Sequence, residues 1–233
     1  MDDDDARHFS HLTRIEELQL SSTRLSDAAL VHVRDLKSLK HLTLPYSLSK
    51  SGLKNVEGLV RLETLHLPHR METKDLGFLR RLTNLRELKL GWGLSESSLL
   101  QIRHLKRLQK LEYLPLDLTD EGLKNLSGLV ALQRLILEDR NITDAGLDHL
   151  VDLSKLKYLD LSETQVTDDG LERLLGLNEL EHVDLSKTNI SDDGLSSLAA
   201  LPNLKQLYIY KTRVTNEGIN RLKKVLPGCE ISF

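Results

Sequence analysis

The chain has 233 residues, of which 39% are apolar, and a formal net charge of −3 from 32 basic and 35 acidic side chains. This near balance gives no bulk electrostatic reason to expect nucleic acid or an anionic membrane as a partner. The sequence contains no run of about 18 apolar residues, so no membrane span is predicted. A single cysteine, Cys229, excludes an internal disulfide and fits a reducing compartment. Because the acidic start lacks a signal-like apolar run, we expect a cytoplasmic protein.

Leucines recur along the chain with a period of 23 or 24 residues. A fixed period in this range indicates a stack of one repeated unit, in which each repeat contacts only its neighbours. The pattern predicts nine such repeats. Their first leucine positions are Leu12, Leu36, Leu59, Leu82, Leu105, Leu129, Leu153, Leu177 and Leu201.

Three segments follow from this pattern. Residues 1–11 are expected to form an acidic N-terminal tail and cap, in which the charged run of residues 2–5 is disordered and solvated. Residues 12–225 are expected to hold the nine repeats of 23–24 residues. Residues 226–233 are expected to add a short closing strand.

Each repeat is expected to contain a short strand followed by a short helix. Leu159 and Leu161 alternate with polar residues, as in a strand with one buried face. Thr167 and Asp168 then precede a helical spacing of leucines, where a hydroxyl or carboxylate can accept unpaired N–H groups. We therefore expect helix capping by a recurring aspartate: Asp27, Asp120, Asp144, Asp168 and Asp192. Left-handed glycines are expected to end the helices at Gly58, Gly128 and Gly176.

Stacking these repeats predicts an α/β solenoid. The strands are expected to form one parallel sheet on the concave side, and the bulkier helices to lie on the convex side and bend the stack into a horseshoe. A threonine recurs at the turn after the strand, where its buried hydroxyl is expected to bond the backbone. These residues are Thr23, Thr164, Thr188 and Thr212.

The repeat resembles the leucine-rich repeat family over Leu12 to about Leu226. The segment Thr164-Gln165-Val166-Thr167-Asp168-Asp169-Gly170-Leu171 resembles the cysteine-containing subclass found beside F-box domains, and similar bacterial repeats. Threonine stands where that subclass often has asparagine or cysteine, and the repeats are shorter. The resemblance implies a protein-binding scaffold and, through the F-box subclass, an inhibitor or adaptor of an enzyme such as a ubiquitin ligase.

The residues that flank the strand leucines are expected to face outward, because strand side chains alternate. They vary from repeat to repeat while the leucines do not, so a partner would be recognised there. The column between the strand leucines is Gln19, Thr43, His66, Lys89, Glu112, Ile136, Asp160, Asp184 and Tyr208.

Repeats two to five depart from the consensus just after the strand, and the only tryptophan lies there. Aromatic and arginine side chains dominate binding hot spots. We predict a partner-binding patch here; alternatively, these repeats have drifted from the consensus and the tryptophan only covers its own loop. The patch comprises Tyr46, His66, His69, Arg70, Lys89 and Trp92.

A second candidate surface lies on later repeats and is acidic, with tyrosines beside it. It could equally be an ordinary solvated surface. Because the first surface carries histidine, lysine and arginine and the second is acidic, the two together would favour a partner with a complementary charge distribution. Its carboxylates are Glu138, Asp139, Asp160, Glu163 and Asp184. The further partner-binding candidates on these repeats are Arg134, Tyr158 and Tyr208.

Catalytic, cofactor and metal sites are not expected. His41 and His66 occupy different columns and are diagonal to each other, whereas zinc needs convergent ligands. The Gly91-Trp92-Gly93 segment lacks the lysine of a phosphate-binding loop. We therefore expect a monomeric protein-binding scaffold without enzymatic activity. A GTPase-activating role, which would depend on Arg70 as a finger-like arginine, is a third alternative.

Overall fold

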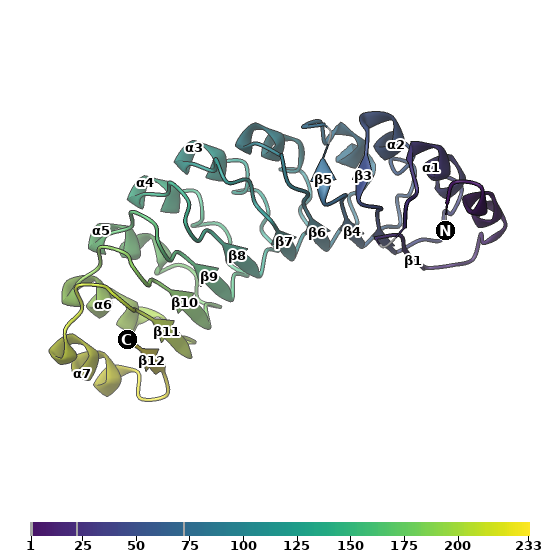
Figure 1. Ribbon diagram of the computed structural model, residues 1–233. Helices are drawn as coiled ribbons and strands as arrows, with labels where there is room; N and C mark the ends of the chain where they lie inside the picture. Colours follow the sequence, from purple (N-terminus) through teal and green to yellow (C-terminus); the bar gives the residue numbers. More distant parts are fainter. Residues whose placement is uncertain (1, 22, 72) are drawn as a thin grey trace. The chain divides into compact units, whose positions relative to one another are not determined.

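The computed structural model describes residues 2–21, 23–71 and 73–233. It divides into two compact units, an N-terminal unit (Met1–Pro115) and a C-terminal unit (Leu116–Phe233). In each unit, short parallel strands lie on one side and short helices on the other (Figure 1). The α/β architecture with a parallel sheet and short helices is therefore confirmed.

The strands of the N-terminal unit pair in parallel, with the strand leucines in register. Leu42 pairs with Leu65, and Leu65 with Leu88, and all three side chains are buried. Burial of one leucine-type layer per repeat holds these three-residue strands together, since none is long enough to be stable alone. The strands are β1 (Glu17–Gln19), β2 (His41–Thr43), β4 (Thr64–His66), β6 (Glu87–Lys89) and β7 (Lys110–Glu112).

The helices of the N-terminal unit begin at serine caps where the repeat is regular. The Ser26 and Ser49 hydroxyls accept hydrogen bonds from the N–H groups of Ala28 and Ser51. Later helices in this unit are 3-10 turns without such a cap. The helices are η1 (Asp5–His11), α1 (Asp27–Val33), α2 (Lys50–Lys54), η2 (Gly77–Arg81) and η3 (Glu96–Gln101).

The acidic start of the chain is ordered, so the expectation of a disordered tail is wrong for the described residues 3–5. Helix η1 buries Ala6 and Phe9, and it packs against α1. The Asp3 carboxylate accepts hydrogen bonds from the backbone N–H of Ser26 at 2.8 Å and from its hydroxyl. These bonds lower the pKa of Asp3 and tie the start of the chain to the first helix of the repeats.

The irregular repeats form a second, two-stranded parallel sheet just after the main strands. It joins β3 (Ser47–Leu48) to β5 (Arg70–Met71), and an isolated bridge continues from Arg70 to Trp92. Buried Leu48 and Met71 add a layer of apolar contacts beneath it. The departure from consensus therefore builds an ordered element.

The C-terminal unit has the more regular repeats. Its strands pair in parallel with Leu135, Leu159, Val183 and Leu207 as the buried central residues. The strands are β8 (Arg134–Ile136), β9 (Tyr158–Asp160), β10 (His182–Asp184), β11 (Gln206–Tyr208) and β12 (Glu230–Ser232). The helices are α3 (Asp120–Leu123), α4 (Asp144–Leu147), α5 (Asp168–Leu171), η4 (Glu172–Leu174), α6 (Asp192–Ser197), η5 (Leu198–Ala200) and α7 (Asn216–Val225). Within the described ranges, no helix is long and apolar enough to cross a bilayer.

The recurring aspartates bond the helix start of the next repeat, so the expected helix capping occurs between successive repeats and not within one repeat. The serine or threonine before each aspartate is the N-cap residue, and the aspartate side chain reaches the N-cap of the next repeat. There it accepts one bond from the backbone N–H and one from the hydroxyl. The pairs are Asp27–Ser49, Asp120–Thr143, Asp144–Thr167, Asp168–Ser191 and Asp192–Thr215.

The turn after the strand contains both the threonine column and the left-handed residues. The hydroxyls of Thr164 and Thr188 each donate to the carbonyl three residues earlier at 2.6 Å, which confirms their structural role. Among the described glycines only Gly93 has a positive φ, so the expected left-handed glycines at the helix ends are wrong. Positive φ falls instead on residues with side chains, most of them charged: Tyr113, Asp139, Glu163, Lys187 and Lys211.

Candidate functional site

The sheet face, which we define as the side chains flanking the central residue of each main strand, is open to solvent as expected, except at Asp160, which is buried. In β2 and β4 the central leucines are at most 1% exposed, whereas the flanking residues are half-buried or exposed. Strand pairing places these flanking residues in two columns across each unit. The variable side chains of successive repeats therefore share one surface within a unit.

Three rings from successive repeats stack beside the sheet face of the N-terminal unit. The rings of Tyr46 and His69 are nearly parallel, with centroids 5.4 Å apart, and the His69 and Trp92 centroids are 4.6 Å apart. Tyr46 is 58% exposed and Trp92 is 61% exposed. We call Tyr46, His69 and Trp92 the ring row.

The backbone of the small sheet fixes the ring row. The N–H of Arg70 donates to the carbonyl of Tyr46 at 3.1 Å, and the N–H of Trp92 donates to the carbonyl of His69 at 2.9 Å. A side chain at Gly91 would collide with the Pro68 carbonyl, so this close approach requires glycine. The rings are therefore held by backbone pairing.

A fourth aromatic residue, Tyr113, joins this surface although the sequence analysis missed it. Tyr113 stands 23 residues after the buried Leu90, at a position where a core leucine is due. Its φ of 58° turns the ring outward, leaving it 51% exposed, and Leu114 is buried next to it. The break in the leucine pattern was the available signal.

Polar side chains complete the surface. His66 Nε2 lies 2.9 Å from Glu87 Oε1, and its Nδ1 lies 3.4 Å from the Thr43 hydroxyl. Lys89 Nζ lies 4.6 Å from the centre of the Tyr113 ring, a cation–π contact. Burial tends to raise the pKa of Glu87, but bonding to His66 and the charge of Lys110 outweigh burial and hold this pKa below its usual value.

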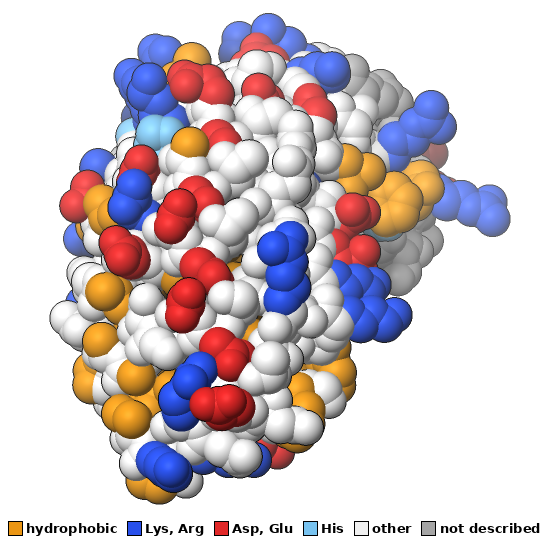
Figure 2. Space-filling model, turned by 90° about the vertical axis from the view of Figure 1, so that its left-hand side faces the viewer, with side chains coloured by type: hydrophobic (Ala, Val, Ile, Leu, Met, Phe, Trp, Pro, Cys, Tyr) orange, Lys and Arg blue, Asp and Glu red, His pale blue; other side chains and the backbone are white. Residues whose placement is uncertain are grey.

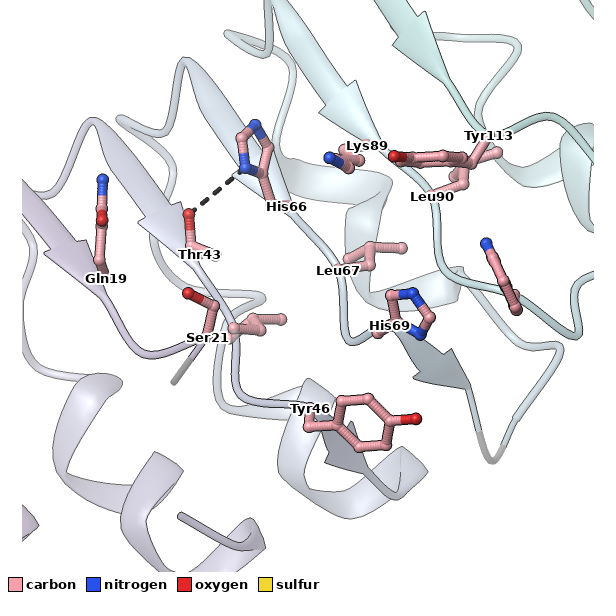
Figure 3. A pocket seen from close by; sticks show the side chains of 12 residues that line it. Gln19, Ser21, Thr43, Tyr46, His66, Leu67, His69, Lys89, Leu90 and Tyr113 are labelled. Carbon is pink, nitrogen blue, oxygen red and sulfur yellow. Dashed lines mark hydrogen bonds between the residues drawn. The ribbon is translucent and has the colours of Figure 1, made fainter. Parts of the chain in front are cut away.

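These residues surround a hollow of about 420 Å³ in the N-terminal unit. Figure 3 shows Tyr46 and His69 along one side of the hollow. His66, on β4, and Lys89, on the neighbouring strand β6, lie on the other side, with Tyr113 beside Lys89. Of the six residues in the predicted patch, five line the hollow and Arg70 does not. The lining residues are Gln19, Ser21, Thr43, Leu44, Tyr46, His66, Leu67, His69, Lys89, Leu90, Trp92 and Tyr113.

The second candidate surface in the C-terminal unit is engaged in local interactions. Asp160 is only 8% exposed, and its Oδ1 accepts bonds from the backbone N–H and hydroxyl of Ser162. Asp184 accepts a bond from the N–H of Ser186 in the same way. These two carboxylates therefore stabilise the turns after their strands, a role that the sequence analysis did not assign to them.

Four other residues predicted on this surface also have partners: Arg134, Tyr158, Glu163 and Tyr208. The Arg134 guanidinium lies 3.6 Å from the centre of the Tyr158 ring, and the Tyr208 hydroxyl donates to Gln206. Glu163 pairs with Lys187 at 2.5 Å. Figure 2 shows acidic side chains lying close to basic ones over much of the visible face.

Metal ligands do not converge in the parts of the chain that the structure describes, where no group of three or more candidate ligands could hold an ion. His41 Nδ1 lies 3.0 Å from the Thr64 hydroxyl, and the strand register confirms that His41 is diagonal to His66. Cys229 is buried, and burial raises the pKa of its thiol, which makes a reactive thiolate unfavourable.

Comparisons with known proteins agree with the repeat pattern. Residues 130–190 match the family model described as leucine rich repeat. An internalin (inlF) of Listeria monocytogenes has a TM-score of 0.65 at 17% identity, covering 96% of this chain and 75% of its own. A leucine-rich repeat protein of Leptospira interrogans has a TM-score of 0.66 at 23% identity, covering 96% of this chain and 56% of its own.

A second internalin of Listeria monocytogenes, C2 (inlC2), has a TM-score of 0.57 at 26% identity, covering 84% of this chain and 80% of its own. The chain thus spans little more than half the length of the Leptospira protein. No curated protein matches the chain. None of these matches bears on the F-box-associated subclass, which stays a prediction. The chain has the leucine-rich repeat solenoid fold, with a parallel sheet and short helices.

Proposed function

We propose that this chain is a protein-binding module whose partner contacts the hollow on the sheet face of the N-terminal unit. Leucine-rich repeat folds generally mediate protein–protein interaction, and stacked repeats present extended surfaces suited to it. The single observation that supports this location most strongly is the exposed ring row of Tyr46, His69 and Trp92.

Aromatic side chains are the most frequent anchors of protein interfaces because they bury a large area with few rotatable bonds. Here three rings from three repeats are already in contact, and hydrogen-bonded backbone orders the segments that bear them. A partner would therefore meet a preorganised apolar surface and lose little entropy in ordering it. His66 and Lys89 at the same hollow would provide polar contacts that orient the partner.

The proposed mechanism is rigid presentation of side chains without catalysis, by a monomer. A reducing compartment such as the cytoplasm suits the buried, unpaired Cys229. No specific observation favours the adaptor or GTPase-activating roles. Arg70, on which the latter depends, belongs to the strand β5 and is not in a long flexible loop.

An affinity experiment with matched variants tests the proposal. Extracts would be passed over the immobilised chain, over Tyr46→Ala and Trp92→Ala, and over a control, Tyr210→Ala. Tyr210 is similarly exposed, at 47%, but lies in the C-terminal unit. We expect proteins retained by the wild type and by Tyr210→Ala to be lost from the ring-row variants, with an effect of at least about tenfold per anchor.

Circular dichroism melting of all four proteins would show whether the folds are equally stable. If the ring-row variants are as stable as the wild type and retain the same proteins, the proposed binding surface is wrong. If these variants instead melt at a lower temperature and retain the same proteins, the rings have a structural role.

A further inference from the structure

A second hollow of about 260 Å³ lies in the N-terminal unit, at the opposite end of the same strands. Three of its residues, Lys40, Glu63 and Arg86, directly precede β2, β4 and β6. Because these strands are parallel, the residues that enter them meet along one edge. The lining residues are Lys40, Arg61, Glu63, Asn84, Arg86 and Arg107.

The charges in this basic hollow do not balance. Lys40 pairs with Glu16 at 2.8 Å, and Arg86 pairs with Glu63 at 3.3 Å. Arg107 is held by the Asn84 side-chain oxygen at 2.8 Å, which is a neutral partner. Four cations thus face two carboxylates, and two positive charges are in excess.

Arg61 is the most available of the cations. Among the described residues it has no hydrogen-bond or ion-pair partner. Lys40 contributes most to lowering the pKa of Glu16, and the charge of Arg61 makes the smallest contribution, after that of His41. The Arg61 and Arg107 side chains are both exposed, so an incoming anion can reach them.

The same repeat positions in the C-terminal unit provide an internal comparison. Lys155 stands where Arg61 and Arg107 stand in their repeats, and it pairs with Glu179 at 2.5 Å. Lys157 and Lys205 both lie within 4 Å of Glu181. Each cation there has a carboxylate partner, so the unpaired guanidinium is not a general property of this repeat.

We infer that the basic hollow binds a phosphate-type dianion, and that the anion is a phosphoryl group on the protein partner. Two excess positive charges match a doubly charged anion, and guanidinium groups bond phosphate oxygens in a fork geometry that lysine lacks. The assignment to the partner rests on the proposed function. The six-residue path from Lys40 to Tyr46 spans about 20 Å in extended chain, so one partner can reach both hollows.

Nuclear magnetic resonance of the full chain tests this inference through the arginine Nε–Hε signals. Four probes would be titrated at constant ionic strength: inorganic phosphate, a short phosphoserine peptide, its unphosphorylated counterpart and a short single-stranded oligonucleotide. We expect saturable shifts at Arg61 and Arg107, with the phosphopeptide binding more tightly than inorganic phosphate. Arg173, which pairs with Asp148 at 2.5 Å in the C-terminal unit, is the internal control and should not shift.

Matched variants sharpen the test. Arg61→Gln and Arg107→Gln should each weaken phosphopeptide binding by up to about fivefold, the range of an exposed ion pair. Glu63→Gln should strengthen it, because it removes a carboxylate from the hollow, and Arg173→Gln should have no effect. A ring-row variant, Trp92→Ala, should leave the phosphate shifts unchanged, so failure of the ring-row proposal and failure of this one are distinguishable.

Several outcomes would overturn the inference. Shifts that do not saturate, or that are equal at Arg173, would show general ionic screening. Equal binding of the two peptides would exclude a phosphoryl group as the recognised feature. Tighter binding of inorganic phosphate, or of a short single-stranded oligonucleotide, than of the phosphopeptide would overturn the assignment to a protein partner.

Discussion

The carboxylate of Asp144 accepts two hydrogen bonds from Thr167 in the next repeat, from its backbone N–H at 2.8 Å and its hydroxyl at 2.6 Å. Thr167 begins the following helix, where backbone N–H groups lack partners within the helix. The same contact links other repeats, including Asp120 to Thr143 and Asp168 to Ser191. This aspartate ladder joins neighbouring helices through polar contacts, in addition to the buried leucines.

Removing one step of the ladder should destabilise the fold. We expect Asp144→Ala to lower the free energy of unfolding by about 1–3 kcal/mol, because it leaves two part-buried donors on Thr167 without an acceptor. Urea denaturation measures this. Asp152→Ala, at an exposed aspartate in the same repeat, should change stability by less than about 0.5 kcal/mol. Equal losses in the two variants would contradict a specific role for the ladder.

The ladder also explains the glycine that stands three residues after each serine or threonine to which an aspartate bonds. A Cβ atom at Gly170 would collide with the Asp144 carboxylate of the preceding repeat, whereas one at Gly176 would have no atom within 4 Å. We expect Gly170→Ala to destabilise the protein by about 1–3 kcal/mol through overpacking. Gly176→Ala should leave stability unchanged or raise it by up to about 1 kcal/mol. Thermal melting of both variants checks this contrast, and a stable Gly170→Ala protein would refute the close approach.

The ladder should make stability depend on acidic pH. Hydrogen bonds from the Thr215 N–H and hydroxyl hold the pKa of Asp192 below its ordinary value of 3.8. A carboxyl whose pKa is lower in the folded state stabilises the fold above its unfolded pKa, and this stabilisation is lost as pH falls through the folded pKa. We therefore expect the urea concentration at the unfolding midpoint to decrease as the pH is lowered below about 4. The Asp192→Asn variant should show a smaller decrease in stability at acidic pH. If its stability depends on pH as that of the wild type does, Asp192 does not contribute to the pH dependence.

Left-handed backbone at Lys211 should be improved by glycine. Its φ is 56°, a conformation that costs an L-residue about 1–2 kcal/mol. We expect Lys211→Gly to raise the free energy of unfolding by up to about 1 kcal/mol, after the greater flexibility of glycine in the unfolded chain is subtracted. Lys224→Gly, in helix α7, should lower it by up to about 1 kcal/mol. Denaturation curves in which both changes destabilise would show that Lys211 is not strained.

The leucine spacing predicted the fold because burial of one apolar layer per repeat leaves few alternatives. Leu42, Leu65 and Leu88 pair in register and are buried, as their period requires. The aspartate ladder was not predicted, although its aspartates were recognised in the sequence. Helix capping and bonding between repeats use the same residue types, and only the distance between neighbouring helices distinguishes them.

The candidate site was predicted in part. Tyr46, His69 and Trp92 were expected to share a patch, and they are in contact. Tyr113 was missed, because its outward direction depends on a positive φ that tyrosine adopts only when Leu114 takes its place in the core. The basic hollow was also missed, since Arg61 and Arg107 are two repeats apart in sequence.

The amino-acid sequence by itself determined the repeat, the parallel strands and which strand side chains face outward, because a periodic apolar pattern can be buried only by stacking. Only the tertiary structure decided which polar groups meet across repeats. Asp144 bonds Thr167, Arg61 has no carboxylate partner and Tyr113 lines the same hollow as the ring row. These outcomes depend on backbone dihedral angles and on distances of a few ångströms between neighbouring repeats, which spacing along the chain does not specify.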